Sequence, residues 1–176
     1  MKTMISRLNE WDEMIFRLFN QHFYRRSLYV LLTKITHLGG ARITIFTLLL
    51  LLVFGKDPYQ TLAKAAAFSL FISHIPVQIG KHLFRRDRPY LTLSNTFVVK
   101  NPLKDHSFPS GHSTAIFAAT TPFMVGIPIL TYILLPLSLL VASSRIFLGL
   151  HYPSDVIVGI LLGFITGIIC FSLFPL

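Results

Sequence analysis

Six apolar runs separated by short polar segments follow the first 26 residues of the chain. The run at residues 61–83 is long enough to cross a bilayer at the helical rise of about 1.5 Å per residue, and residues 112–126, 128–150 and 154–174 complete the set. The runs at 27–38 and 42–55 are shorter than the ~20 residues that a span needs. The pattern predicts an all-α fold, a polytopic membrane helix bundle of about six transmembrane helices. Five spans plus interfacial helices is the competing count.

The N-terminal segment, residues 4–23, has the pattern of an amphipathic helix, and Trp11 is suited to a membrane interface. Its apolar residues fall mostly on one helix side: Ile5, Leu8, Ile15, Phe16, Phe19 and Phe23. An ordinary helix packed on the bundle fits equally well. No repeat or low-complexity linker divides the chain. We therefore expect one membrane domain over residues 1–176, with an amphipathic segment at 1–26 and the bundle at 27–176.

The composition also indicates a membrane protein. Only 13% of the residues are charged and 53% are hydrophobic, whereas soluble domains carry about 25% charged residues. The net charge is +9, from 16 basic and 7 acidic side chains, a balance that can indicate nucleic-acid binding. The basic residues lie between apolar runs, however. They therefore favour the membrane bilayer and an anionic substrate as partners, and not nucleic acid.

The order of the runs predicts which polar segments share a face of the membrane. If residues 61–83 run outward from the cytoplasm, segments 84–111 and 145–155 lie together on the face away from the cytoplasm. The N-terminal segment, Lys56 and Lys64 then lie on the cytoplasmic face, where basic residues near span ends are favoured. Segment 84–111 is also rich in basic residues, and we attribute part of them to substrate binding.

The first polar cluster lies on the run at residues 61–83. His74, Gln78 and Lys81 are spaced i, i+4 and i+7, so they share one helix face. Ionisable groups in membrane helices are costly and usually functional, although a polar stripe satisfied inside the bundle explains this spacing as well. Arg88 follows at the membrane edge, because Pro89 ends the helix.

The second cluster precedes the run at residues 112–126. Ser110 is a suitable N-cap, and Gly111 allows a ligand to approach the backbone closely. Exposed amides at a helix N-terminus bind anions, with simple capping as the alternative.

The third cluster comprises Arg145, His151 and Asp155. If the last helix includes His151, Asp155 lies one turn further on the same face. Its carboxylate can then accept a proton from one imidazole nitrogen and leave the other free to attack. A lone ion pair at a helix end is the alternative.

The three clusters reach the same side of the membrane in this topology. Lys81, Arg88 and Arg145, together with helix amides, match the three oxygens of a transferring phosphoryl group. His112 and His151 supply a nucleophile and an acid. No group of carboxylates and histidines has the pattern of a metal cage. The sequence therefore predicts phosphoryl transfer without a metal ion or another cofactor.

These residues resemble the three signature motifs of the type 2 phosphatidic acid phosphatase (PAP2) superfamily, and the resemblance extends from about residue 61 to residue 176. The motifs are Lys81-x6-Arg88-Pro89, Pro109-Ser110-Gly111-His112 and Ser144-Arg145-x5-His151-x3-Asp155. The resemblance implies a helical membrane bundle with a phosphatase site that faces away from the cytoplasm.

The resemblance also implies a role for each motif residue. His151 attacks phosphorus and forms a phosphohistidine, and Asp155 orients and stabilises His151. His112 protonates the leaving oxygen and then helps to activate water. The phosphate oxygens are held by Lys81, Arg88, Ser110, Gly111 and Arg145.

The expected substrate is a lipid phosphate or diphosphate: undecaprenyl diphosphate, phosphatidylglycerophosphate or phosphatidate. We expect the loop from Tyr90 to Ser107 to influence this choice. The compact chain favours a bacterial enzyme, a multi-pass protein of the cytoplasmic membrane with its site on the extracytoplasmic face. The sequence does not predict an oligomeric state.

Three other functions fit parts of the pattern. A phosphotransferase would pass the phosphate from lipid to another acceptor. Vanadium-dependent haloperoxidases share this site pattern, but the membrane spans argue against them. A lipid transporter or scramblase would do no chemistry, and the intramembrane residues Lys34 and His74 would be its best support.

Gly159, Gly163 and Gly167 form a run of small residues at spacing four on the last helix. This pattern allows close helix packing in lipid, so we expect it to press the last helix against a neighbour and to fix the site geometry.

Overall fold

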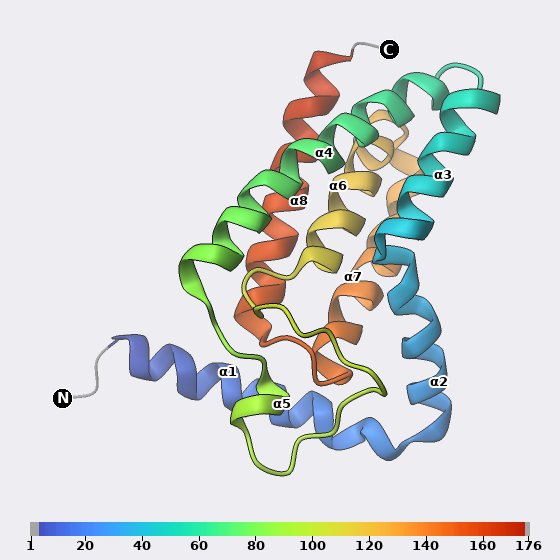
Figure 1. Cartoon of the computed structure of the whole chain (residues 1–176). Helices are drawn as coiled ribbons and strands as arrows, with labels where there is room; N and C mark the ends of the chain where they lie inside the picture. The colour runs from blue at the N-terminus through green and yellow to red at the C-terminus, as the bar shows by residue number, and fades with distance from the viewer. Residues whose placement is uncertain (1–3, 175–176) are drawn as a thin grey trace.

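The computed structural model describes residues 4–174, and all regular elements in that range are helical (Figure 1). The α-helices are α1 (Met4–Asn20), α2 (Arg26–Ile35), α3 (Ala41–Phe54), α4 (Tyr59–Phe84), α5 (Pro89–Thr92), α6 (Gly111–Gly126), α7 (Thr131–Phe147) and α8 (Pro153–Leu173). Short 3-10 helices lie between them: η1 (Gln21–Tyr24), η2 (Thr36–Gly39) and η3 (Pro128–Leu130). The predicted all-α fold is confirmed.

Within the described range, three stretches are long and apolar enough to cross a membrane: Tyr59–Thr92, Pro128–Phe147 and Pro153–Leu173. Arg26–Gly39 and Ala41–Phe54, which meet at a bend of 54°, add a fourth if they cross together. Large apolar side chains on the outer surface are exposed, as on Phe71, Ile133 and Ile169, and this suits contact with lipid. The protein is a multi-pass membrane protein, but the predicted count of about six spans is not confirmed.

The N-terminal helix lies at the opposite end of the bundle from the one predicted. Asp12 on α1 accepts hydrogen bonds from Arg86 and from the backbone amide of Ser154 at the start of α8, so α1 adjoins the polar loops (Figure 1). The prediction that the N-terminal segment lies on the other face is wrong. It treated residues 27–38 and 42–55 as two separate spans, whereas the structure joins them in one bent path between α1 and α4.

The central helix of the bundle is α6, which packs against both α4 and α8. A Cβ atom at Gly163 of α8 would lie 2.3 Å from the carbonyl oxygen of Thr114 and 2.8 Å from the nitrogen of Ala118 on α6. A Cβ at Gly167 would lie 2.5 Å from Cβ of Thr121 on α6, and one at Gly159 would lie 2.6 Å from the carbonyl oxygen of Ser110, directly before α6. The predicted close packing of the glycine stripe is confirmed. It fixes the start of α8 beside the start of α6.

Candidate active site

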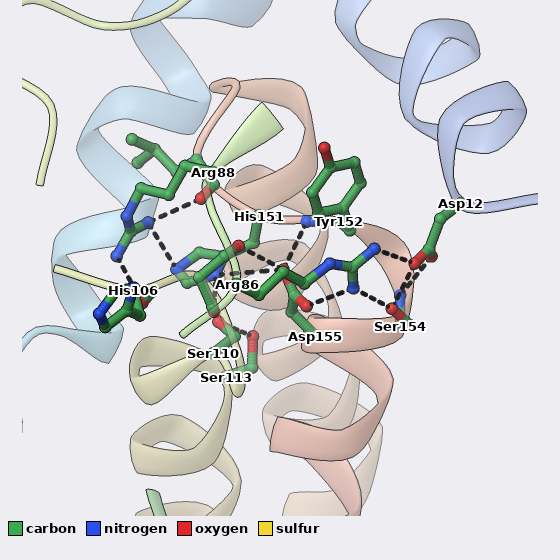
Figure 2. A network of polar contacts seen from close by, with 12 residues as sticks. Asp12, Arg86, Arg88, His106, Ser110, Ser113, His151, Tyr152, Ser154 and Asp155 are labelled. Carbon is green, nitrogen blue, oxygen red and sulfur yellow. Dashed lines mark hydrogen bonds and ion pairs between the residues drawn. The ribbon is translucent and has the colours of Figure 1, made fainter. Parts of the chain in front are cut away.

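Residues of all three polar clusters of the sequence meet in the structure, and Figure 2 shows Arg88, Ser110 and His151 close together. Lys81 lies in the last turn of α4, Arg88 directly before α5, and Arg145 in the last turn of α7. A single cavity of about 540 Å³ is lined at one end by Lys81, Arg88, Asp105, Gly111, His112 and His151. The start of α6 and the loop before α8 therefore face the same space.

His151 lies in the loop between α7 and α8 and is 1% exposed. Its Nδ1 is 2.7 Å from the carbonyl oxygen of Ser107, and its Nε2 is 3.1 Å from Nη1 of Arg88. A carbonyl can only accept and a guanidinium can only donate, so the proton sits on Nδ1 and the lone pair on Nε2. Burial lowers the pKa of His151 to about 4; Asp155 opposes this effect, and Arg88 and Arg145 add to it. The ring is therefore neutral at neutral pH, as a nucleophilic histidine requires.

Asp155 is fully buried but does not bind the imidazole directly. Its carboxylate accepts hydrogen bonds from the Ser107 hydroxyl, from the Tyr152 amide and from Arg86, and lies 3.8 Å from Nδ1 of His151. The expected acceptor of the imidazole proton was Asp155; in the structure it is the carbonyl oxygen of Ser107. The reason is that α8 begins at Pro153 and not before His151, so Asp155 caps the helix instead.

Arg145 is buried, with 2% of its surface exposed. It donates one hydrogen bond to the Thr36 hydroxyl, at 2.7 Å. Its Nε and Nη2 have no hydrogen-bond partner in the described part of the chain, although its charge acts on both His112 and His151. A buried cation with unpaired donors is costly, and a bound anion would remove that cost.

Ser110 takes the N-cap position of α6, as predicted, but its hydroxyl pairs with Ser113 at 2.9 Å and makes no capping hydrogen bond (Figure 2). The first turn of α6, with Gly111 and His112, lines the cavity without a side-chain cap. Backbone amides at such a helix start can bind an anion. The start of α6 thus offers a phosphate hydrogen-bond donors in addition to those of Lys81, Arg88 and Arg145.

Asp105 occupies the cationic end of the cavity. Its carboxylate forms ion pairs with Lys81 and with Arg88, the latter at 2.8 Å. Burial raises the pKa of Asp105, but the two ion pairs outweigh burial and lower it to about 2. Asp105 is therefore ionised at neutral pH, and it pairs with the two cations that an anionic ligand would need, Lys81 and Arg88.

We expect Asp105→Asn to bind inorganic phosphate or vanadate about tenfold more tightly, the equivalent of ~1.4 kcal/mol, because the competing charge is gone. Inhibition constants for vanadate would measure this. Asp57→Asn is the matched control, since Asp57 binds only Thr61 in the part of the chain described and belongs to the turn between α3 and α4, which lies at the other end of the bundle (Figure 1). An inhibition constant that stays equal or rises in Asp105→Asn would contradict the competition.

Several residues of the site carry no clear signal in the sequence. Ser107 contributes a backbone carbonyl, which any residue has. Asp105 precedes the second motif, but its pairing with Lys81 and Arg88 depends on how the loop folds. Arg86 lies in the basic segment 84–111, only part of which is expected to bind substrate, and it binds Asp155. Among residues 4–174, no group of three or more His, Cys, Asp or Glu side chains could hold a metal ion.

Comparison with known proteins gives a consistent set of relatives. The family model described as PAP2 superfamily matches residues 62–176. An undecaprenyl-diphosphatase from Sulfolobus acidocaldarius is 28% identical over 146 residues, which cover 82% of this chain and 68% of the relative. A putative undecaprenyl-diphosphatase from Escherichia coli, YbjG, is 37% identical over 106 residues, 59% of this chain and half of the relative. The crystal structure of Aquifex aeolicus LpxE superposes with a TM-score of 0.81 at 29% identity and covers 90% of this chain and 93% of LpxE.

Proposed function

The chain belongs to the PAP2 superfamily of phosphatases, and on that basis we propose that it removes the terminal phosphate from a lipid phosphate or lipid diphosphate. In this proposal the reaction passes through a phosphohistidine at His151 and needs no metal ion. The observation that carries the proposal is the cavity, which joins a cationic, histidine-containing end to an apolar groove.

The groove runs between α3 and α4. Its walls are aliphatic and aromatic side chains, among them Leu48, Leu49 and Leu52 on α3 and Leu70 and Phe71 on α4. Such walls suit a hydrocarbon chain, and the cations at the end suit a phosphate group. A lipid phosphate carries both parts in one molecule. A soluble phosphate ester would leave the apolar part of the cavity unfilled.

The first chemical step is attack by Nε2 of His151 on phosphorus. Arg88 donates a hydrogen bond to this nitrogen in the free protein. We propose that the same N–H group donates to a phosphate oxygen instead when substrate binds. The bond between phosphorus and the leaving oxygen breaks, and His112, which takes up a proton when the anionic substrate binds, donates that proton to the leaving oxygen. Lys81, Arg88, Arg145, the Ser110 hydroxyl and the Gly111 amide stabilise the charge on the phosphoryl oxygens.

The second step releases the phosphate. His112, now neutral, takes a proton from water, and the water oxygen attacks the phosphohistidine. The nitrogen–phosphorus bond breaks, and its electron pair returns to Nε2 of His151. Asp155 supports both steps by holding Ser107, whose carbonyl keeps the proton on Nδ1.

We also place the site on the extracytoplasmic face of a bacterial cytoplasmic membrane, which the family resemblance implies. The basic residues of the N-terminal segment no longer support this placement of the site, because α1 lies at the same end of the bundle as the site. Labelling of a Lys100→Cys variant with an impermeant maleimide tests the placement. Reaction in intact cells supports it, and reaction in broken cells alone contradicts it.

The proposed function is tested by phosphate release from the purified protein in detergent with EDTA present. The substrates would be undecaprenyl diphosphate, phosphatidylglycerophosphate and phosphatidate. Release that persists in EDTA and disappears in His151→Ala supports the proposal, and the preferred lipid identifies the substrate. Equal release by both proteins contradicts the role of His151. Release that depends on an added acceptor would indicate a phosphotransferase.

A further inference from the structure

The N-terminal helix α1 turns polar residues towards the bundle and large apolar residues outward. Its buried stripe is Asp12, Phe16 and Asn20, which are at most 7% exposed. Its outer surface carries large apolar side chains that are about half exposed or more: Leu8, Trp11, Met14 and Leu18. In water this pattern would be unfavourable, but it suits a helix that lies in the membrane interface with its apolar side in lipid.

The polar residues of the buried stripe bind the bundle at two places. Asn20 exchanges hydrogen bonds with the backbone of Phe97 and donates another to the carbonyl oxygen of Phe147. Asp12 accepts hydrogen bonds from the Ser154 amide, at 2.9 Å, and from Nη2 of Arg86, at 2.7 Å. Through Arg86, only one side chain separates α1 from Asp155.

Arg86 lies between two carboxylates (Figure 2). Its Nη1 donates to Asp155 at 2.8 Å while its Nη2 donates to Asp12. The guanidinium also stacks on the ring of Tyr152, with its central carbon 3.9 Å from the ring centroid. These contacts, together with a hydrogen bond from Nη1 to the Ser154 hydroxyl at 2.7 Å, hold the guanidinium towards Asp155, and Asp12 accepts hydrogen bonds from both Arg86 and Ser154.

We propose that Arg86 and Asp12 are positioning residues of the phosphatase site. Asp12 fixes Arg86, Arg86 fixes Asp155, and Asp155 holds the Ser107 hydroxyl. The Ser107 carbonyl then sets the tautomer of His151. The inference rests on the proposed function, and it makes α1 part of the active-site support, although α1 lies outside the residues matched by the family model. Neither residue touches the substrate in this account.

This series of contacts from Asp12 to His151 predicts a change in the titration of His151. The charged and titratable groups that act on His151 are Arg88 before α5, His112 on α6, Arg145 on α7 and Asp155 on α8. Arg86 partly neutralises Asp155. Without Arg86, the carboxylate acts more strongly on the imidazole and favours its protonated form. The pKa of His151 should therefore rise in Arg86→Gln.

The test combines kinetics with NMR titration of histidine-labelled protein in detergent. We expect Asp12→Asn and Arg86→Gln each to lower kcat by about 10- to 100-fold with little change in KM, and the double variant to be no worse than the poorer single one. The His151 signals, assigned with His151→Asn, should shift in both single variants and titrate at higher pH in Arg86→Gln. Asp12→Glu, which keeps the charge, should restore part of the activity.

Glu13→Gln is the matched control, since Glu13 neighbours Asp12 and its ion pair with Arg17 is exposed. It should change neither kcat nor the His151 signals. Unchanged kcat in Asp12→Asn and Arg86→Gln, or losses that multiply in the double variant, would overturn the inference. Losses of kcat that only follow a lower melting temperature would overturn the inference as well. If the wild type releases no phosphate, the proposed function fails, and the His151 titration still decides whether Arg86 and Asp12 set the environment of that ring.

Discussion

His151→Ala should lower kcat by ~10⁴-fold or more, because removal of a covalent nucleophile leaves only binding and electrostatic stabilisation. The Nε2 lone pair of His151 is the group that we expect to attack phosphorus, and burial keeps the ring neutral for this purpose. KM should change little, since the phosphate-binding cations stay in place. Steady-state phosphate release at saturating lipid would measure the effect.

His82→Ala is the control for His151→Ala. His82 is an exposed histidine of α4 whose Nδ1 lies 2.8 Å from the carbonyl oxygen of Gln78, and its loss should leave kcat within about twofold, as for surface substitutions. Added imidazole should restore part of the activity of His151→Ala, since it can enter the vacated space. A His151→Ala protein that retains a tenth of wild-type kcat would contradict the assignment of the nucleophile.

Gly163→Leu should destabilise the protein by more than ~3 kcal/mol, beyond the usual range for an overpacked core. The nearest atoms to a Cβ at this position are the Thr114 oxygen, the Ala118 nitrogen and the Phe117 Cβ, at 2.3, 2.8 and 2.9 Å. Two of these are backbone atoms of α6, so no side-chain rotation can make room. The helices α6 and α8 must move apart, and His112 and His151 would separate with them. Thermal unfolding in detergent and phosphate release would both show the effect.

Gly111→Ala provides the stability control for Gly163→Leu. A Cβ at Gly111 would meet only Val77 Cγ1, at an ordinary contact distance of 3.8 Å. Its melting temperature should therefore stay close to that of the wild type, whatever happens to its activity. Unchanged stability and activity in Gly163→Leu would show that the glycine stripe does not hold the two helices together.

Much of the fold follows from the apolar pattern. The runs at residues 61–83 and 154–174 match α4 (Tyr59–Phe84) and α8 (Pro153–Leu173) closely, because lipid-facing helices must be apolar along their whole length. The bend between α2 and α3 was not predictable from hydropathy, since a broken span and two short spans have the same composition. Because of that single ambiguity, the sequence predicted α1 at the wrong end of the bundle.

The orientation of α1 could not be predicted for a related reason. Amphipathicity identifies two faces of a helix, but in a membrane either face can turn to the protein. The buried face of α1 has Asp12 and Asn20, and its outer face has Leu8 and Trp11. Partners such as Arg86, 74 residues from Asp12, become visible only when the chain is folded.

The motifs predicted which residues gather at the site, but they did not predict how His151 is held. The expected contact between Asp155 and the imidazole needed a helix that includes His151, and Pro153 starts the helix two residues too late. The carbonyl of Ser107 takes that place. Backbone groups have no sequence signature, so contacts of this kind need the three-dimensional structure.

The most direct test of the account is capture of the phosphorylated enzyme. Protein in detergent with EDTA would be mixed with lipid diphosphate labelled with ³²P in its terminal phosphate, quenched in alkali, which preserves phosphohistidine, and digested for mass spectrometry. We predict label on the peptide that contains His151, formed and lost at rates consistent with turnover, and no label in His151→Ala. Label on another residue, or steady turnover with no labelled enzyme at any time, would contradict nucleophilic catalysis by His151.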